Sequence, residues 1–254
     1  MAELKCKTIE CLHNKSPEEL LESVPYKWRA FNQDLPTKDE KQHHWLVRDG
    51  NILTKTDNET TDQIPFVAGA PAEVDASVEL FSYLDWNDTS KYKLYLESKL
   101  GSFDASLPAD LTDRYFRPEF THWQQFASLL SDVRTICPLY RSTLDAAQSF
   151  RSKQIYFYVT TQRRHTDIGF VADASSDIAA IMGLYDANTI EEKNFVENME
   201  TLFYGFARTG KFPEDQIVTN AVHLVDEHIQ RNGFYPNCDF WIQHGFYPNY
   251  TRVD

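Results

Sequence analysis

The sequence lacks the short motifs that mark nucleotide, metal and serine-hydrolase sites. Its nine glycines are scattered, so neither G-x-G-x-x-G nor G-x-x-x-x-G-K occurs, and the nucleophile motif G-x-S-x-G is absent as well. The four cysteines form no C-x-x-C pair, and His43 and His44 lie in a polar stretch, so we expect no metal site. No cofactor is expected either.

Basic residues and long apolar runs are also scarce. The chain has 25 lysines and arginines against 38 aspartates and glutamates, a formal net charge of −13 that would repel a phosphate backbone. Nucleic acid is therefore not an expected partner. No run approaches the roughly 20 apolar residues that span a bilayer, and the first ten residues hold no apolar signal segment. We expect any membrane anchor to lie outside this chain.

What the sequence contains favours a globular domain of an oxidising compartment. With 254 residues, 42% of them hydrophobic, the chain can bury one sizeable core. Four cysteines, an even number, fit two disulfides, with four buried thiols as the alternative. Glycan acceptor patterns occur at Asn58, Asn87 and Asn249, and a fourth, at Asn14, is weakened by Pro17.

Hydrophobic patterns predict alternating helices and strands. Apolar runs at residues 64–69 and 155–159 predict buried strands, and Ser16 with Glu19 forms a capping box that predicts a helix start. Helical periodicity is found in residues 120–136, 138–150, 177–182 and 190–209. The polar stretches 34–51 and 57–63 are predicted to be surface loops. This order is typical of α/β layering with a mainly parallel sheet.

Seven segments along the chain share their order and pattern with one known family. They read CLHNKSPEELLE, WLVRDG, IPFVAGAPAEVDAS, LLSDVRTICPLY, QIYFYVTT, EEKNFVENMETLFYGFARTGKFP and CDFWIQHGFYP. Together they resemble the C-terminal half of the cholinesterase and type-B carboxylesterase family, which has the α/β-hydrolase fold, although WLVRDG lacks the family's proline. The resemblance implies that residues 1–254 are the C-terminal half of a single cholinesterase-like extracellular domain. A preceding segment, outside this chain, would supply the rest of the sheet and the serine nucleophile.

The same resemblance assigns roles to individual residues. It implies disulfides between Cys6 and Cys11 and between Cys137 and Cys238. Active members read Asp-His-Gly-Asp-Glu-Leu where this chain has residues 173–178, and their histidine takes the proton from the serine. Here Ala174 stands at that place and cannot transfer a proton. Loss of one triad member costs on the order of 10⁴ to 10⁶ in rate, so we expect no enzyme activity.

Two further residues bear on the triad. His165 is the nearest substitute for the missing imidazole, but Arg163 and Arg164 beside it would disfavour its charged form. Counting from Gly69 without a gap places the acidic member at Val74, whereas one inserted residue places it at Asp75. Asp75 is thus either a remnant of the triad or a solvated loop acid. Without an imidazole to orient, it has no catalytic use.

Resemblance to the non-catalytic adhesion members of this family implies a cell-surface receptor domain. Its expected role is heterophilic adhesion in the nervous system, on the extracellular face of the plasma membrane. The secreted immunoglobulin-superfamily protein amalgam is the implied ligand. The chain stops after CDFWIQHGFYPNYTRVD without a stalk or span, which favours the adhesion members anchored on the N-terminal side.

Other functions and the contact residues stay open at this point. A secreted serine carboxylesterase is the main alternative; it would combine a serine of the missing half with Asp75 and another histidine. A structural or carrier domain is a third class. The residues expected to contact a ligand are the segment 34–51 and the tyrosine-rich C-terminal end.

Overall fold

The computed structural model describes residues 4–23, 35, 46–47, 65–76, 86, 88–101, 103–149, 154–212, 222–233, 235–244 and 251–252. The chain divides into two compact units, Met1–Asp34 and Leu35–Asp254, and each is described by itself. The predicted glycan sites Asn58, Asn87 and Asn249 lie outside the described residues.

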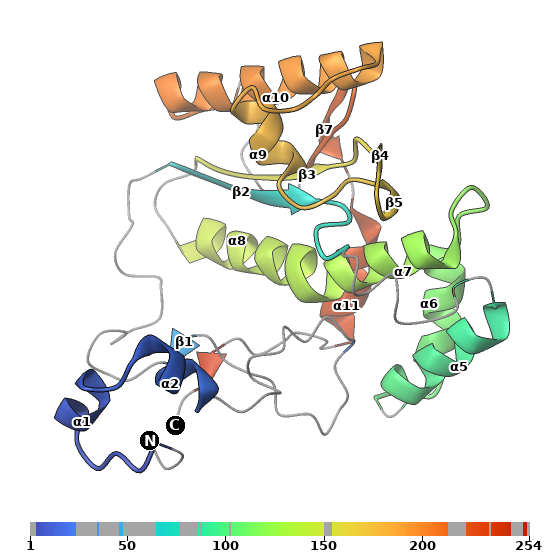
Figure 1. Ribbon diagram of the computed structural model, residues 1–254. Coiled ribbons are helices and arrows are strands. Elements are labelled where there is room, and N and C mark those ends of the chain that lie inside the picture. The colour runs from blue at the N-terminus through green and yellow to red at the C-terminus, as the bar shows by residue number, and fades with distance from the viewer. Residues whose placement is uncertain are drawn as a thin grey trace. The chain divides into compact units, whose positions relative to one another are not determined.

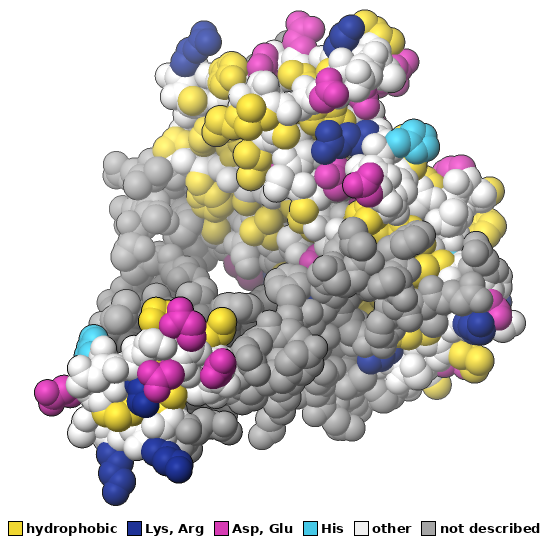
Figure 2. All heavy atoms as spheres, viewed as in Figure 1, with side chains coloured by type: hydrophobic (Ala, Val, Ile, Leu, Met, Phe, Trp, Pro, Cys, Tyr) yellow, Lys and Arg dark blue, Asp and Glu magenta, His cyan; other side chains and the backbone are white. Residues whose placement is uncertain are grey.

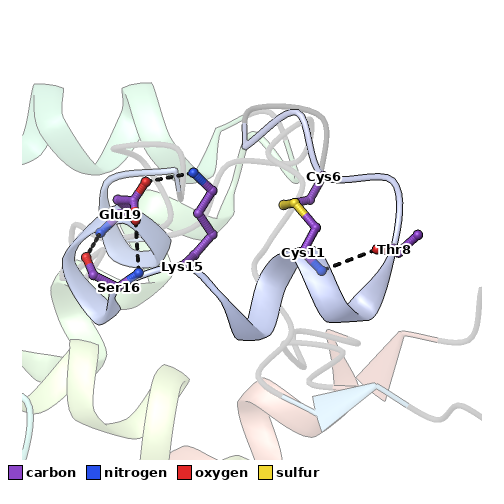
Figure 3. The surroundings of a disulfide bond; sticks show 6 residues. All are labelled: Cys6, Thr8, Cys11, Lys15, Ser16 and Glu19. Carbon is purple, nitrogen blue, oxygen red and sulfur yellow. Dashed lines mark hydrogen bonds and ion pairs between the residues drawn. A yellow bond between two sulfur atoms is a disulfide. The ribbon is translucent and has the colours of Figure 1, made fainter.

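The smaller unit contains two short helices, α1 (Ile9–His13) and α2 (Pro17–Glu22). The predicted capping box starts α2, as Figure 3 shows: the backbone N–H of Glu19 donates to Ser16 Oγ at 3.1 Å, and the Ser16 N–H donates to the Glu19 carboxylate at 3.0 Å. This exchange satisfies two backbone donors that the helix start would otherwise leave without partners.

The larger unit is built on a four-stranded sheet with the order β2-β3-β6-β7 (Figure 1). Its strands are β2 (Phe66–Pro71), β3 (Ile155–Thr160), β6 (Val222–Val225) and β7 (Ile229–Gly233). The first three run parallel and β7 is antiparallel, so the prediction of a mainly parallel sheet is confirmed. The register pairs Pro71 with Thr160, which brings the carboxyl ends of β2 and β3 to the same edge.

Two small sheets accompany the main one. The hairpin of β4 (Arg164–Thr166) and β5 (Gly169–Val171) is antiparallel and follows β3. Near the ends of the unit, β1 (Leu46–Val47) pairs in parallel with β8 (Thr251–Arg252). The prediction that residues 34–51 form a surface loop is therefore wrong at β1. It is also wrong at Leu35, which is fully buried in the core.

Helices cover both faces of the main sheet, with α9 and α10 on one face and α8 on the other (Figure 1). The helices of the unit are α5 (Thr89–Leu100), α6 (Leu107–Tyr115), α7 (His122–Ser131), the π-helical turn η2 (Asp132–Ile136), α8 (Cys137–Ser149), α9 (Ser176–Ile181), α10 (Ile190–Thr209) and α11 (Pro236–Gln243). Within the described parts of the chain, no helix has the length and apolarity to cross a membrane.

The segment from α7 to α8 is one nearly continuous helical run rather than the two separate helices predicted. Pro138 has no N–H to donate and its ring would clash with the carbonyl four residues earlier in a regular α-helix. The wider π-helical turn η2 ends at Ile136, two residues before this proline. Such a turn relaxes the clash while the helix axis continues.

Successive side chains of β3 point to opposite faces of the sheet, and the core is accordingly divided into two clusters. Phe157 and Val159 pack into the cluster formed with α5 to α8 and α11, whereas Tyr156 and Tyr158 pack into the cluster formed with α9 and α10. All six residues of β3 are buried, as expected for a strand covered by helices on both faces. The fold is thus a three-layer α/β/α arrangement.

The four cysteines form the two disulfides that the resemblance implies. Cys6 bonds to Cys11 in the smaller unit (Figure 3), and Cys137 bonds to Cys238 in the larger one. The second bond joins α8 to α11 across a sequence separation of 101 residues. None of the described cysteines carries a free thiol.

Asp132 connects η2, α6 and α11 through a buried network. Its carboxylate accepts hydrogen bonds from the hydroxyls of Tyr115 and Tyr235, both at 2.6 Å, and from Asn237 Nδ2 at 2.9 Å. The indole N–H of Trp241 in turn donates to the Tyr115 hydroxyl at 2.8 Å. Burial raises the pKa of Asp132 to about 6, although its hydrogen bonds oppose this rise.

This raised pKa predicts a loss of stability as the pH rises. The folded protein holds the Asp132 proton more tightly than the unfolded chain does, so the stabilisation is complete below about pH 4 and lost through about pH 6. The change amounts to about 3 kcal/mol. Denaturant unfolding of the intact protein between pH 4 and 7 should show this decline, and Asp132→Asn should remove it. If the free energy of unfolding changes with pH equally in the unmodified protein and in Asp132→Asn, the prediction is wrong. Asp110→Asn, at an exposed position, is the control.

Candidate functional site

The site is the turn between β5 and α9, residues Ala172 to Ser175, beyond the carboxyl ends of the parallel strands. Two side chains of helix α7 bond to the β4–β5 hairpin that leads into this turn. Trp123 Nε1 donates to the Ile168 carbonyl at 2.6 Å, and Gln124 Nε2 donates to the Phe170 carbonyl at 2.7 Å. In open α/β sheets this edge is where ligands and catalytic groups gather.

The turn has a backbone that suits glycine, but this chain places serine there. Ser175 has φ +69° and ψ 2°, the left-handed conformation, and it precedes α9 without a side-chain capping bond. The resemblance places a glycine at this position in active hydrolases. Ala174 and Ser175 are both exposed, and the Ala174 methyl group offers neither a donor nor an acceptor. The left-handed backbone at Ser175 thus suits the glycine that the resemblance places there, and the side chain at position 174 is a methyl group.

Ser175→Gly is expected to stabilise the protein by about 0.5–1 kcal/mol, because a left-handed residue with a Cβ pays a steric penalty that glycine avoids. Chemical denaturation of the intact protein measures the effect. Ser175→Ala is the matched control, since it keeps the Cβ and removes only the hydroxyl. A glycine variant no more stable than the alanine variant would refute the idea that φ at this position costs free energy.

Glu73 is the carboxylate that contacts the strand leading into the turn. It is 1% exposed and lies two residues beyond the end of β2. Its Oε2 accepts the Ala172 N–H at 2.9 Å, and the Ala172 carbonyl accepts the Glu73 N–H at 3.1 Å. Two bonds between the same pair of residues fix the turn to the end of β2.

The Glu73 carboxylate also forms a bidentate ion pair with an arginine. Arg163 donates from Nη2 to Glu73 Oε1 at 2.7 Å and from Nε to Oε2 at 3.1 Å, and Ser128 Oγ donates to Oε1 at 2.7 Å. The Arg163 guanidinium also lies over the Phe120 ring, 4.6 Å from its centroid. A buried charge with a bidentate partner and further donors has its desolvation compensated. The Glu73 carboxylate thus accepts four hydrogen bonds, two of them from Arg163.

Glu73 and Arg163 were not predicted as a pair, although the sequence carries a signal for them. Glu73 lies two residues after β2 and Arg163 three residues after β3. Once β2 and β3 are known to be parallel neighbours, opposite charges placed just past both carboxyl ends are expected to meet.

Asp75, the predicted acidic position, contacts the end of α7 and the π-helical turn η2. Thr135 Oγ1 donates to its carboxylate at 2.8 Å, and its backbone N–H donates to Ser131 Oγ at 3.0 Å. Burial raises the pKa of Asp75, while the Arg134 guanidinium and the bond from Thr135 oppose the rise. The described contacts of Asp75 therefore connect it to the α7–α8 run.

The flanking acids of the turn are held by other partners. Asp173 pairs with Arg164 through two bonds of 3.2 and 3.3 Å, and this pairing raises the pKa of the Arg164 guanidinium. Asp177, 4% exposed, accepts the Tyr158 hydroxyl at 2.7 Å; burial and this carboxylate raise the pKa of that phenol. Both arginines beside His165 are thus paired with carboxylates. These contacts hold the turn on β3 and β4.

His165 lies on β4, exposed, with its ring 4.9 Å from that of Phe170, its partner across the hairpin. Three other imidazoles bond backbone carbonyls through Nδ1. His122 lies 2.9 Å from the Trp86 oxygen, His223 3.3 Å from the Phe157 oxygen and His228 2.9 Å from the Glu227 oxygen. Burial lowers the pKa of His223. Across the described ranges, no group of three or more potential metal ligands gathers.

Comparison with solved structures identifies the fold. PNB esterase matches with a TM-score of 0.52 and 16% sequence identity, covering 92% of this chain and 49% of its own. Juvenile hormone esterase from Manduca sexta matches at a TM-score of 0.43 and 12% identity, over 72% of this chain and 41% of its own. The chain has the α/β-hydrolase fold of the esterases, and it spans about half of that fold.

Sequence comparison names a relative. Neurotactin of Drosophila melanogaster is 31% identical over 270 aligned residues, covering 100% of this chain and 30% of that protein. No protein-family profile matches the chain. The chain is similar to neurotactin along its whole length, and it spans less than one third of that protein.

Proposed function

We propose that this chain is part of a non-catalytic, cholinesterase-like receptor domain that mediates heterophilic cell adhesion in the nervous system. The domain would lie on the extracellular face of the plasma membrane, with its anchor outside these 254 residues. Its ligand would be a secreted immunoglobulin-superfamily protein, amalgam or a protein of the same kind. Similarity to neurotactin along the whole chain supports this proposal.

The observation that carries the non-catalytic part is Ala174, which stands where the resemblance places the histidine of active relatives. The left-handed backbone at Ser175 and the anchored carboxylate of Glu73 hold the turn in place, yet the side chain at 174 is a methyl group. The Arg163–Glu73 pair supports the same interpretation, since it gives the carboxylate that contacts Ala172 a structural role. Two disulfides fit the proposed extracellular location.

A secreted serine carboxylesterase is the alternative, and it requires an imidazole beside a serine from another segment. Among the described histidines, His165 is the nearest in sequence to the turn, and its ring packs on Phe170 at the outer side of the hairpin. The contacts of His122 and His223 use a ring nitrogen on the backbone. No described contact brings an imidazole to Glu73 or Asp173. This favours the receptor proposal over the carboxylesterase.

An aggregation assay tests the adhesion proposal. Cells that display the intact protein should cluster when purified amalgam is added and stay dispersed without it. Ala174→His should cluster equally well, because adhesion does not depend on the chemistry of this turn. Cells that show surface display but no ligand-dependent clustering or binding would overturn the proposed ligand.

A further inference from the structure

Three large apolar side chains on and just after α9 are open to solvent. Ile178 is 55% exposed, Met182 66% and Leu184 79%, and we call these three residues the α9 patch. Figure 2 shows hydrophobic side chains gathered over the α9 and α10 part of the visible face. Such a group on a short helix is unusual, because a solvent-facing helix surface is normally polar.

The α9 patch is not a poorly packed edge of the core, because the opposite side of the same helix is buried. Ala180 is fully buried in the α9–α10 cluster, and Asp177 is held by the Tyr158 hydroxyl. The exposed side runs from Ser175 through Ile178 to Met182, at helical spacings of three and four residues. The whole stretch IAAIMGL contains no charged residue.

The composition of the α9 patch distinguishes between candidate occupants. Interfaces with immunoglobulin-type proteins are rich in aromatic and polar contacts. This patch has aliphatic and thioether side chains with no charge among them, which is typical of a surface buried permanently inside a domain. A second copy of the chain would need a larger self-complementary surface than these three residues provide.

Length and sheet order point to the same occupant. The matched esterase chain is covered to 49%, so a comparable length of that fold has no counterpart in these 254 residues. In the described sheet β2 is an end strand, and its sequence FVAGAP carries none of the charges that protect a natural sheet edge. The end strand β2 therefore lacks the charges expected of an edge that faces solvent.

We propose that the α9 patch packs against an apolar surface of the remaining part of the esterase-like domain, outside these 254 residues, and is not the ligand-binding face. The proposal does not depend on adhesion, because an active esterase would need the same packing. It goes beyond the proposed function by stating which surface of this chain is unavailable to a ligand.

Methionine oxidation tests this in the unmutated, intact protein. Dilute hydrogen peroxide oxidises accessible methionines to sulfoxides, and mass spectrometry of peptides reads each site separately. Met199, fully buried between α10 and the sheet, is the internal control. If the patch is covered, Met182 should oxidise within about tenfold of the Met199 rate. A Met182 rate within about tenfold of that in the urea-unfolded protein would overturn the proposal.

Thiol labelling separates the other occupants. In the intact protein, Leu184→Cys should react with a maleimide at least about tenfold more slowly than Glu197→Cys, a control at an exposed position of α10. Equal rates would overturn the proposal. Protection that appears only at high protein concentration would assign the patch to a second copy, and protection only with added amalgam would assign it to the ligand. Either result also overturns it.

Discussion

Replacing Arg163 with methionine is expected to lower the free energy of unfolding by about 3–5 kcal/mol, because it leaves the buried Glu73 carboxylate without its cation. Glu73 is 1% exposed, and Arg163 supplies two of its four hydrogen bonds. The methionine keeps the apolar volume over Phe120 but not the charge. Urea unfolding of the intact protein, followed by tryptophan fluorescence, measures the loss.

Arg141→Met is the matched control for this experiment. Arg141 also pairs with a carboxylate, that of Asp145 at 3.0 Å, but both side chains are nearly half exposed and the pair lies within one helix. Exposed pairs of this kind contribute about 0–1 kcal/mol. Equal losses for the two variants would show that the Glu73 pair is not a buried anchor. The double variant Glu73→Gln with Arg163→Met should recover part of the loss, since neither charge then stays buried.

Removing the Cys137–Cys238 disulfide, with alanine at both positions, should cost about 5 kcal/mol. The bond closes a loop of 101 residues in sequence, and the entropy that a cross-link removes from the unfolded chain grows with loop length. Both cysteines are almost completely buried, where α8 meets α11. Differential scanning calorimetry of the intact protein should show a clearly lower melting temperature.

The Cys6–Cys11 bond provides the comparison. It spans only five residues and lies in the smaller unit, so its removal should cost about 2 kcal/mol or less and leave the larger unit's transition in place. If removing the short bond lowers stability as much as removing the long one, or more, the Cys137–Cys238 bond is not the main covalent stabiliser of the contact between α8 and α11.

Much of the larger unit could be predicted because its local signals agree with its tertiary contacts. The helix at 190–209 has the predicted bounds, since Thr189 caps its start and Gly210, with φ +71°, ends it. The strand at 155–159 was predicted to within one residue because its side chains are aromatic or β-branched and all buried.

Other elements gave weaker signals, and α5 is the clearest case. Its buried side chains include Tyr92 and Leu96, but three lysines lie in the same stretch and Leu94 is 63% exposed. The apolar stripe is therefore diluted, and periodicity alone did not reveal it. At the site, the sequence pattern placed Ala174 in a turn before a helix. It did not reveal the Glu73–Arg163 pair, because these residues are 90 positions apart and meet only through the pairing of β2 with β3.

Ester hydrolysis by the intact protein tests the central claim most directly. The account predicts that hydrolysis of a simple aryl ester by the unmodified protein does not exceed the buffer rate, because Ala174 can neither accept nor return a proton. Ala174→His serves as the comparison that restores an imidazole to the turn. Robust turnover by the unmodified protein, abolished by a serine-directed fluorophosphonate, would contradict the receptor interpretation.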